Sequence, residues 1–142
     1  MTNPLKILRD GRQLLDPVLE KHGFEWAPGE SGTSSGGDFA CGEYVRGDRR
    51  LEIHFRHSLG LVTYHVGRDS FEHPAYMRVL LGPNGGNKCP GFSGEPLDAF
   101  RDLAHDLNTF CGAFLSGSDE EFRELAERVV ADSKITGIKR LP

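Results

Sequence analysis

The stretch that decides the fold is residues 39–67, FACGEYVRGDRRLEIHFRHSLGLVTYHVG. Within it, apolar and polar residues alternate twice, in EIHFRH at residues 52–57 and in VTYHV at residues 62–66. Alternation with a period of two is typical of strands that bury one face of a sheet. The segments RGDR at residues 46–49 and SLGL at residues 58–61 separate these runs and are typical of hairpin turns. The stretch therefore predicts consecutive antiparallel strands.

The alternation also predicts how the second pair of strands aligns. A two- or four-residue turn within residues 58–61 places Phe55 opposite Tyr64 and His54 opposite His65. A slip of one residue would move every apolar side chain of one strand to the polar face. We therefore expect a turn of even length.

Helical patterns mark four further segments. Residues 4–22 have apolar side chains near helical spacing, and residues 73–81 begin with His-Pro and predict a short helix. Residues 97–114 have the strongest periodicity, with apolar residues at intervals of three and four, which predicts an amphipathic helix of about five turns. The sequence SDEE at residues 118–121 matches a capping box and predicts the start of a final helix.

Two glycine-rich segments, residues 29–37 and residues 82–95, are expected to be loops. A chain of 142 residues buries enough surface to fold without disulfides or a structural metal. We therefore expect a single α+β domain over residues 1–142, with an antiparallel sheet of three to four strands. This sheet would pack against the N-terminal helix and the two C-terminal amphipathic helices.

The cysteines and the apolar runs predict a cytoplasmic address. Cys41, Cys89 and Cys111 are odd in number and widely spaced, which is typical of free thiols in a reducing compartment. Residues 1–15 intersperse charges among the leucines, unlike a secretory signal. No apolar run approaches the roughly 20 residues needed to span a bilayer, so no membrane partner is expected.

One constellation predicts a metal site on the polar face of the sheet. If RGDR closes as a two-residue turn, Cys41, His54 and His65 form one row across three strands, and all three are zinc ligand types. A turn of odd length would instead place Cys41 on the apolar face. The alternative is a polar face exposed to water, since zinc sites usually have closely spaced ligands.

A nucleophilic site is a weaker candidate. Cys89 lies in a glycine-rich segment, and His105 has Asp102 three residues before it and Asp106 beside it. The alternative is that Cys89 is an ordinary loop thiol and His105 is solvated. Cys111 lies on the apolar stripe and is expected in the core. No P-loop and no dinucleotide-binding glycine motif occurs, so no cofactor is expected.

Charge is distributed unevenly along the chain. The net charge of -4 argues against a nucleic-acid partner. Residues 95–133 contain ten acidic and three basic residues, a formal charge of -7, whereas residues 43–68 carry +2. The two C-terminal helices therefore predict an acidic binding surface. Its candidate binding residues are Asp98, Asp102, Asp106, Glu120, Glu124 and Glu127.

The N-terminal part resembles a known class of proteins. Leu15, Pro17 and Leu19, followed by Gly23-Phe24, resemble the helix-then-strand opening of small bacterial α+β proteins among the polymorphic-toxin immunity proteins. This resemblance implies a binding protein without catalysis. Uncharacterised bacterial proteins of similar length are also similar in the segments SLGLVTYH (58–65), PGFS (90–93) and PLDAF (96–100).

Three functions compete at this stage. The leading hypothesis is a non-catalytic module that binds a basic protein, such as a nuclease toxin, through acidic helices. The second is a small enzyme or metal-binding protein that uses the polar sheet face and the glycine-rich segments. The third is a homodimer formed through an open sheet edge.

Overall fold

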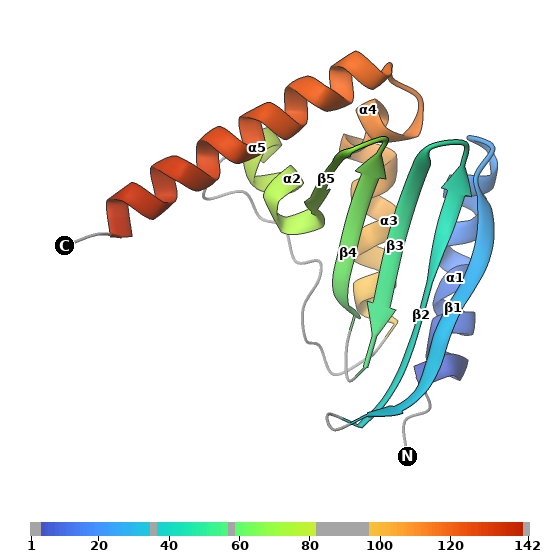
Figure 1. Cartoon of the computed structure of the whole chain (residues 1–142). Coiled ribbons are helices and arrows are strands. Elements are labelled where there is room, and N and C mark those ends of the chain that lie inside the picture. Colours follow the sequence, from blue (N-terminus) through green and yellow to red (C-terminus); the bar gives the residue numbers. More distant parts are fainter. Residues whose placement is uncertain (1–3, 35–36, 57–58, 82–96, 141–142) are drawn as a thin grey trace.

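The computed structural model describes residues 4–34, 37–56, 59–81 and 97–140; for residues 33, 34, 37, 60 and 133–140 it describes the backbone only. Five helices and five strands occur within these ranges (Figure 1). In chain order they are α1 (Pro4–Glu20), β1 (Glu25–Ser34), β2 (Gly37–Arg46), β3 (Arg49–Phe55), β4 (Leu59–Val66), β5 (Asp69–Glu72), α2 (His73–Leu81), α3 (Asp98–Phe110), α4 (Gly112–Leu115) and α5 (Asp119–Arg140).

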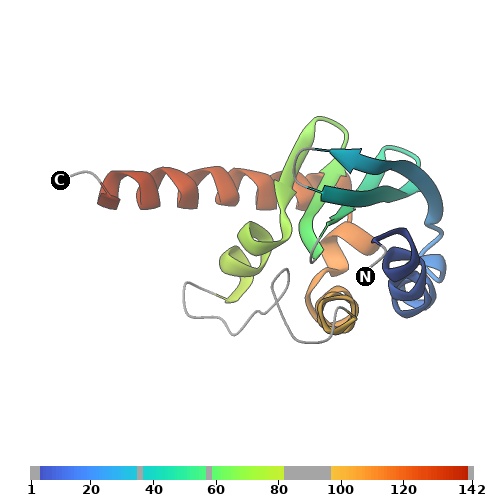
Figure 2. The same ribbon diagram turned by 90° about the horizontal axis from the view of Figure 1, so that it is seen from below.

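The strands form one antiparallel sheet in the order β1-β2-β3-β4-β5, so each strand pairs with its neighbour in the chain. Helices α1 and α3 pack together and cover one face, which we call the inner face (Figures 1 and 2). Helices α2 and α5 pack on each other and on the β4–β5 side of the sheet. The α+β prediction is confirmed, with five strands rather than three to four. Among the described helices, none combines the length and the hydropathy required to cross a bilayer.

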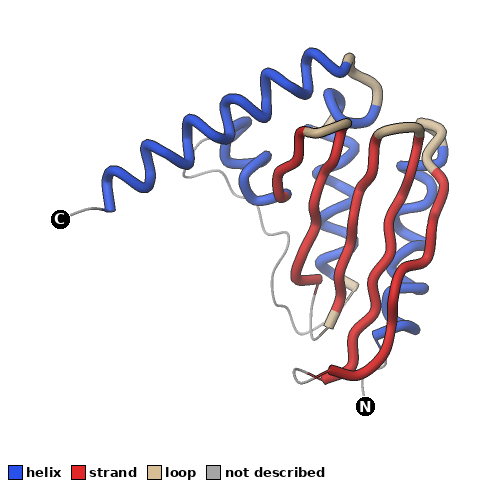
Figure 3. Tube along the Cα trace, in the orientation of Figure 1, coloured by secondary structure: helices blue, strands red, loops and turns tan. Residues whose placement is uncertain are grey.

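The inner face carries the core of the protein. One row of directly opposed residues crosses all five strands, which Figure 3 draws as red tubes. It consists of Trp26, Tyr44, Leu51, Tyr64 and Phe71. All but the partly buried Trp26 are nearly inaccessible to water. This burial of large side chains holds the helices on the sheet.

The first hairpin has the predicted register. Gly47-Asp48 forms a two-residue turn, and Cys41 lies opposite His54. Gly47 has φ +60°, the positive value at the first central position that type II′ hairpin turns reserve for glycine. The alternative with an odd-length turn, which would have buried Cys41 in the core face, is wrong.

The predicted register of the second hairpin is wrong by four residues. Tyr64 lies opposite Leu51 rather than Phe55, and His54 lies opposite Leu61 rather than His65. The cause is that β4 already begins at Leu59, which the SLGL segment had assigned to the turn, and Leu59 pairs with Phe55. Because the error is an even number of residues, the apolar side chains still face the core.

Residues 29–37 were expected to form a loop, and this expectation is wrong for the described part. Gly29 to Ser34 belong to β1, which pairs with β2 at the edge of the sheet. The pairing uses backbone groups, so it needs no apolar alternation in the sequence. The register shifts between Pro28 and Ser31, and an edge strand tolerates a proline because it lacks a second partner.

The long helix predicted over residues 97–114 is interrupted. Helix α3 ends at Phe110, Cys111 departs from helical geometry with ψ 29°, and α4 resumes for four residues at Gly112. The apolar spacing continues across the break because Phe114 is buried in the same core as Cys111. The capping prediction for α5 is confirmed, since the amide of Glu121 donates to Ser118 Oγ at 3.1 Å.

Candidate functional site

The predicted metal ligands lie on the outer face of the sheet but do not converge. Cys41 is opposite His54, whereas His65 is opposite Arg50. Each of the three side chains contacts other residues. The Cys41 thiol donates to the Glu30 carbonyl oxygen at 3.1 Å. Among the described residues, no three His, Cys, Asp or Glu side chains are grouped to hold a metal ion. The predicted row is therefore not formed, because it depended on the incorrect register of the second hairpin.

Both outer-face histidines are engaged by neighbours. His65 Nε2 lies 3.0 Å from Glu52 Oε1, and the ring of His54 stacks on Phe39 with centroids 5.7 Å apart. A small hollow of about 120 Å³ lies nearby, lined in part by Cys41 and Glu43. These contacts are those of a polar sheet face exposed to water.

The candidate acidic residues on α3 do not form one surface with those on α5. Asp106 is buried and bonds His73 instead of facing water. Asp98 pairs with Arg101 at 2.8 Å, and Asp102 is half-buried. Figures 1 and 2 show that α3 crosses behind the sheet while α5 runs along its β5 side. The prediction of a shared acidic flank is therefore corrected by the packing of α3.

On α5 the acidic residues remain exposed. Glu120, Glu124 and Glu127 are separated by four and three residues, so they lie on one side of the helix. None of the three carboxylates has a hydrogen bond or an ion pair with another residue in the part of the chain that the structure describes. We call this set the α5 acidic stripe.

A buried network of hydrogen bonds links α3, α2 and β4. His73 Nε2 lies 2.8 Å from Asp106 Oδ2, and His73 Nδ1 lies 2.6 Å from Tyr64 Oη. Tyr64 Oη lies 3.5 Å from Cys111 Sγ. Burial raises the pKa of the Cys111 thiol to about 12, against the lowering effect of the Tyr64 hydrogen bond, while Asp106 adds to the rise. His73 is inaccessible to water, and these hydrogen bonds tie α2 and α3 to β4 within the core.

The sequence analysis did not predict this network, because its hydrogen-bonded residues are 9 to 47 residues apart and follow no known motif. The only local signal was His73 at the first position of a helix. The other catalytic candidate, His105, is exposed and contacts the ring edge of Phe110. Cys89 lies outside the described residues.

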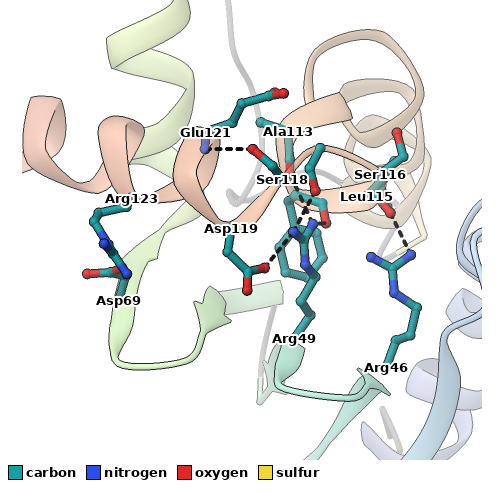
Figure 4. Close-up of polar contacts among 12 residues, drawn as sticks. Arg46, Arg49, Asp69, Ala113, Leu115, Ser116, Ser118, Asp119, Glu121 and Arg123 are labelled. Atoms are coloured by element: carbon teal, nitrogen blue, oxygen red, sulfur yellow. Dashed lines mark hydrogen bonds and ion pairs between the residues drawn. The ribbon is translucent and has the colours of Figure 1, made fainter.

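A second polar cluster joins the sheet to the start of α5, and Arg49 is its centre (Figure 4). Its guanidinium is buried although it lies at the end of a strand. One terminal nitrogen donates to the carbonyl oxygens of Ala113 at 3.1 Å and Phe114 at 2.6 Å. The other donates to the Gly117 carbonyl at 2.6 Å and to Asp119 Oδ1 at 3.0 Å. We call these contacts the Arg49 clamp.

Arg46 performs a related role beside it. Its guanidinium donates to the His22 carbonyl at 2.6 Å and to the Leu115 carbonyl at 2.7 Å, and it lies over the Phe24 ring. Helix α4 has only four carbonyl groups, and that of Gly112 accepts from the backbone amides of Ser116 and Gly117, both at 2.9 Å. The two arginines satisfy three of these carbonyl groups, but only Arg49 also reaches α5.

A charged cleft of about 390 Å³ lies next to the Arg49 clamp. Two of its carboxylates already have basic partners: Asp119 pairs with Arg49, and Asp69 lies 3.9 Å from Arg123. Neither this cleft nor the smaller hollow on the outer face is lined by a histidine. The cleft is lined by Asp48, Val66, Gly67, Arg68, Asp69, Asp119 and Arg123.

Comparison with known proteins adds no relative. No protein-family model, curated protein or solved structure gives a significant match to the chain. Function is therefore inferred from the described residues and their geometry.

Proposed function

We propose that this protein is a non-catalytic binding module that docks a basic protein partner on the α5 acidic stripe. The observation that carries the proposal is the exposure of Glu120, Glu124 and Glu127 on one side of a helix, with no basic partner among the described residues. Such a concentration of one charge raises the rate of encounter with an oppositely charged protein.

The opposite side of α5 is fixed to the sheet and to α2. Phe122 is fully buried and stacks on Phe71 of β5, with ring centroids 4.6 Å apart. Arg78 of α2 pairs with Asp132 at 2.9 Å and adds a second attachment. A helix held in this way presents its outer side at little entropic cost to a partner.

The proposed partner is a cationic protein such as a nuclease toxin, which makes the module immunity-like. Neutralising a toxin inside the producing cell would place it in the cytoplasm. The free thiols of Cys41 and Cys111 are compatible with a reducing compartment.

The test replaces the three glutamates of the stripe by glutamine and measures binding to the basic products of the adjoining genes after co-expression. Affinity at low salt is expected to fall by about tenfold or more, because three attractive charges are removed. The matched control is the triple variant Glu20→Gln, Glu25→Gln and Glu72→Gln, which removes the same charge from exposed positions on α1, β1 and β5.

The outcomes separate the hypotheses. Weakening by the stripe variant alone supports the proposal, and equal weakening by both variants reduces it to an effect of net charge. If no adjoining product binds, the immunity-like role is wrong. If the chain sediments as a dimer and the stripe variant makes it monomeric, the partner is a second copy.

A further inference from the structure

We propose that Arg49 is the positioning residue of the α5 acidic stripe: it fixes the direction in which α5 leaves the sheet, and thereby the place where the stripe meets its partner. This inference rests on the proposed function, because it concerns the same binding surface. Arg49 lies on β3 and touches none of the three glutamates of the stripe.

The geometry of the clamp spans the whole connection into α5. Ala113 and Phe114 belong to α4, Gly117 lies in the link, and Asp119 is the first residue of α5. A planar guanidinium donates in fixed directions, so four acceptors on one group define the path of this link relative to β3. Figure 4 shows two of these acceptor residues, Ala113 and Asp119, beside the Arg49 guanidinium.

The burial of Arg49 indicates that its hydrogen bonds to the α4–α5 connection matter more than its surface ion pair. Its side chain is only 6% exposed, whereas that of its ion-pair partner Asp119 is 65% exposed. Burying a guanidinium is costly unless its donors are satisfied, and here the backbone carbonyls supply most of the acceptors. A surface ion pair alone would not need a buried arginine.

The length of α5 amplifies any change at its start. Glu127 lies about 12 Å along the helix from Asp119, at about 1.5 Å per residue. A rotation of about 10° at the clamp would move Glu127 by about 2 Å, several times the spread of about 0.5 Å found among hydrogen-bond distances. The contacts of Phe122 keep α5 near the sheet, but apolar packing is less directional than the clamp.

The first experiment measures the direction of α5 without any partner. Residual dipolar couplings of the backbone amides of α5 and of β2–β4 are fitted to one alignment tensor. In wild type both sets are expected to fit together. In Arg49→Met the α5 set is expected to need a different tensor while the sheet still fits by itself. Couplings that fit one tensor in Arg49→Met would overturn the proposal.

Arg46→Met is the matched control, because Arg46 also holds an α4 carbonyl but does not contact α5. Its α5 couplings are expected to keep the wild-type tensor, and an equal change in both variants would overturn a specific role for Arg49. If Arg49→Met does not fold, Asp119→Asn replaces it. That variant keeps the three carbonyl bonds and removes the charge of the α5 acceptor, and a smaller change of tensor is then expected.

The second experiment separates positioning from charge through the salt dependence of partner binding. Arg49→Met keeps all three glutamates and leaves Asp119 without its ion-pair partner, so affinity is expected to fall by about tenfold at every salt concentration with a salt slope that is not reduced. The stripe variant is expected to reduce the slope itself. Unchanged affinity in Arg49→Met would overturn positioning for binding. If wild type binds no partner, the proposed function fails, whereas the couplings still report on the clamp.

Discussion

His73 Nε2 and Asp106 Oδ2 lie 2.8 Å apart in the interior, with side-chain exposures of 0% and 9%. The pair joins the first residue of α2 to the middle of α3, two helices that are separated in the chain by residues 82–97. Each side chain satisfies the hydrogen-bonding capacity that the other would otherwise leave buried and unpaired. The pair therefore ties α2 to the core in a way that apolar contacts alone would not specify.

Replacement of Asp106 by alanine is expected to lower the free energy of unfolding by about 3 kcal/mol or more, since it leaves His73 buried without its acceptor. Urea denaturation followed by circular dichroism measures the change. Asp102→Ala is the control on the same helix, and it is expected to change stability by no more than about 0.5 kcal/mol.

The double variant Asp106→Leu with His73→Phe tests whether the cost comes from the unpaired partner. Replacing both members by apolar groups removes the desolvation penalty of the pair, so part of the lost stability is expected to return; the loss that stays is the His73 hydrogen bond of the Tyr64 hydroxyl, which keeps its contact with Cys111 Sγ. If the double variant is as unstable as the sum of the two single variants, the pair has no special coupling.

The buried thiol of Cys111 predicts a loss of stability in alkali. Burial raises the pKa of the thiol from its ordinary value of 9.0 to about 12. A raised pKa stabilises the fold fully below pH 9, and this contribution is lost as the pH rises from 9 towards 12. The stability advantage of wild type over Cys111→Ala is therefore expected to shrink by about 1 kcal/mol between pH 9 and pH 10.

The measurement is a series of urea titrations of both proteins from pH 7 to pH 10.5. Burial also raises the pKa values of Tyr44 and Tyr76 in each protein, so these contributions largely cancel in the difference; only the part of the Tyr76 rise that comes from the Cys111 charge is lost in Cys111→Ala. Leu103→Ala is a control that truncates the core without removing a titrating group. A constant difference between wild type and Cys111→Ala across this range would contradict the prediction.

The sequence predicted elements well where local pattern decides them. The period of two identified the buried sides of β3 and β4, and the capping box located the start of α5. Register was not predictable in the same way, because shifts by an even number of residues bury the same side chains. Strand β1 was partly missed, since Gly29 to Ser34 pair through backbone groups that leave no trace in the apolar pattern.

In the candidate site, too, local pattern predicts some features and tertiary structure decides the others. Exposure of Glu120, Glu124 and Glu127 follows from helical spacing within one element, whereas their role in binding stays a prediction. Burial of Asp106 depends on His73, which is 33 residues away in the chain, so it required the tertiary structure. Arg49 is similar, because its acceptors are backbone carbonyls that no residue type identifies in advance.

The contact between α1 and α3 in the core makes the effect of alanine differ in sign between two glycines. A Cβ atom on Gly11 of α1 would lie 2.4 Å from Phe100 Cδ1 of α3, whereas a Cβ on Gly112 of α4 would meet nothing within 4 Å. Alanine normally stabilises a helix by up to about 1 kcal/mol relative to glycine. Gly112→Ala is therefore expected to raise stability by a fraction of this amount.

Gly11→Ala is expected to lower stability by about 1–3 kcal/mol, because the fully buried ring of Phe100 stacks on Phe55 and has little room to move. Chemical denaturation of both single variants measures the two signs. Phe100→Ala removes the ring atoms that the new methyl group would strike, so the double variant with Gly11→Ala is expected to be more stable than additivity allows. Additive losses, or a stabilising Gly11→Ala, would show that α1 and α3 separate easily and that this contact does not set their spacing.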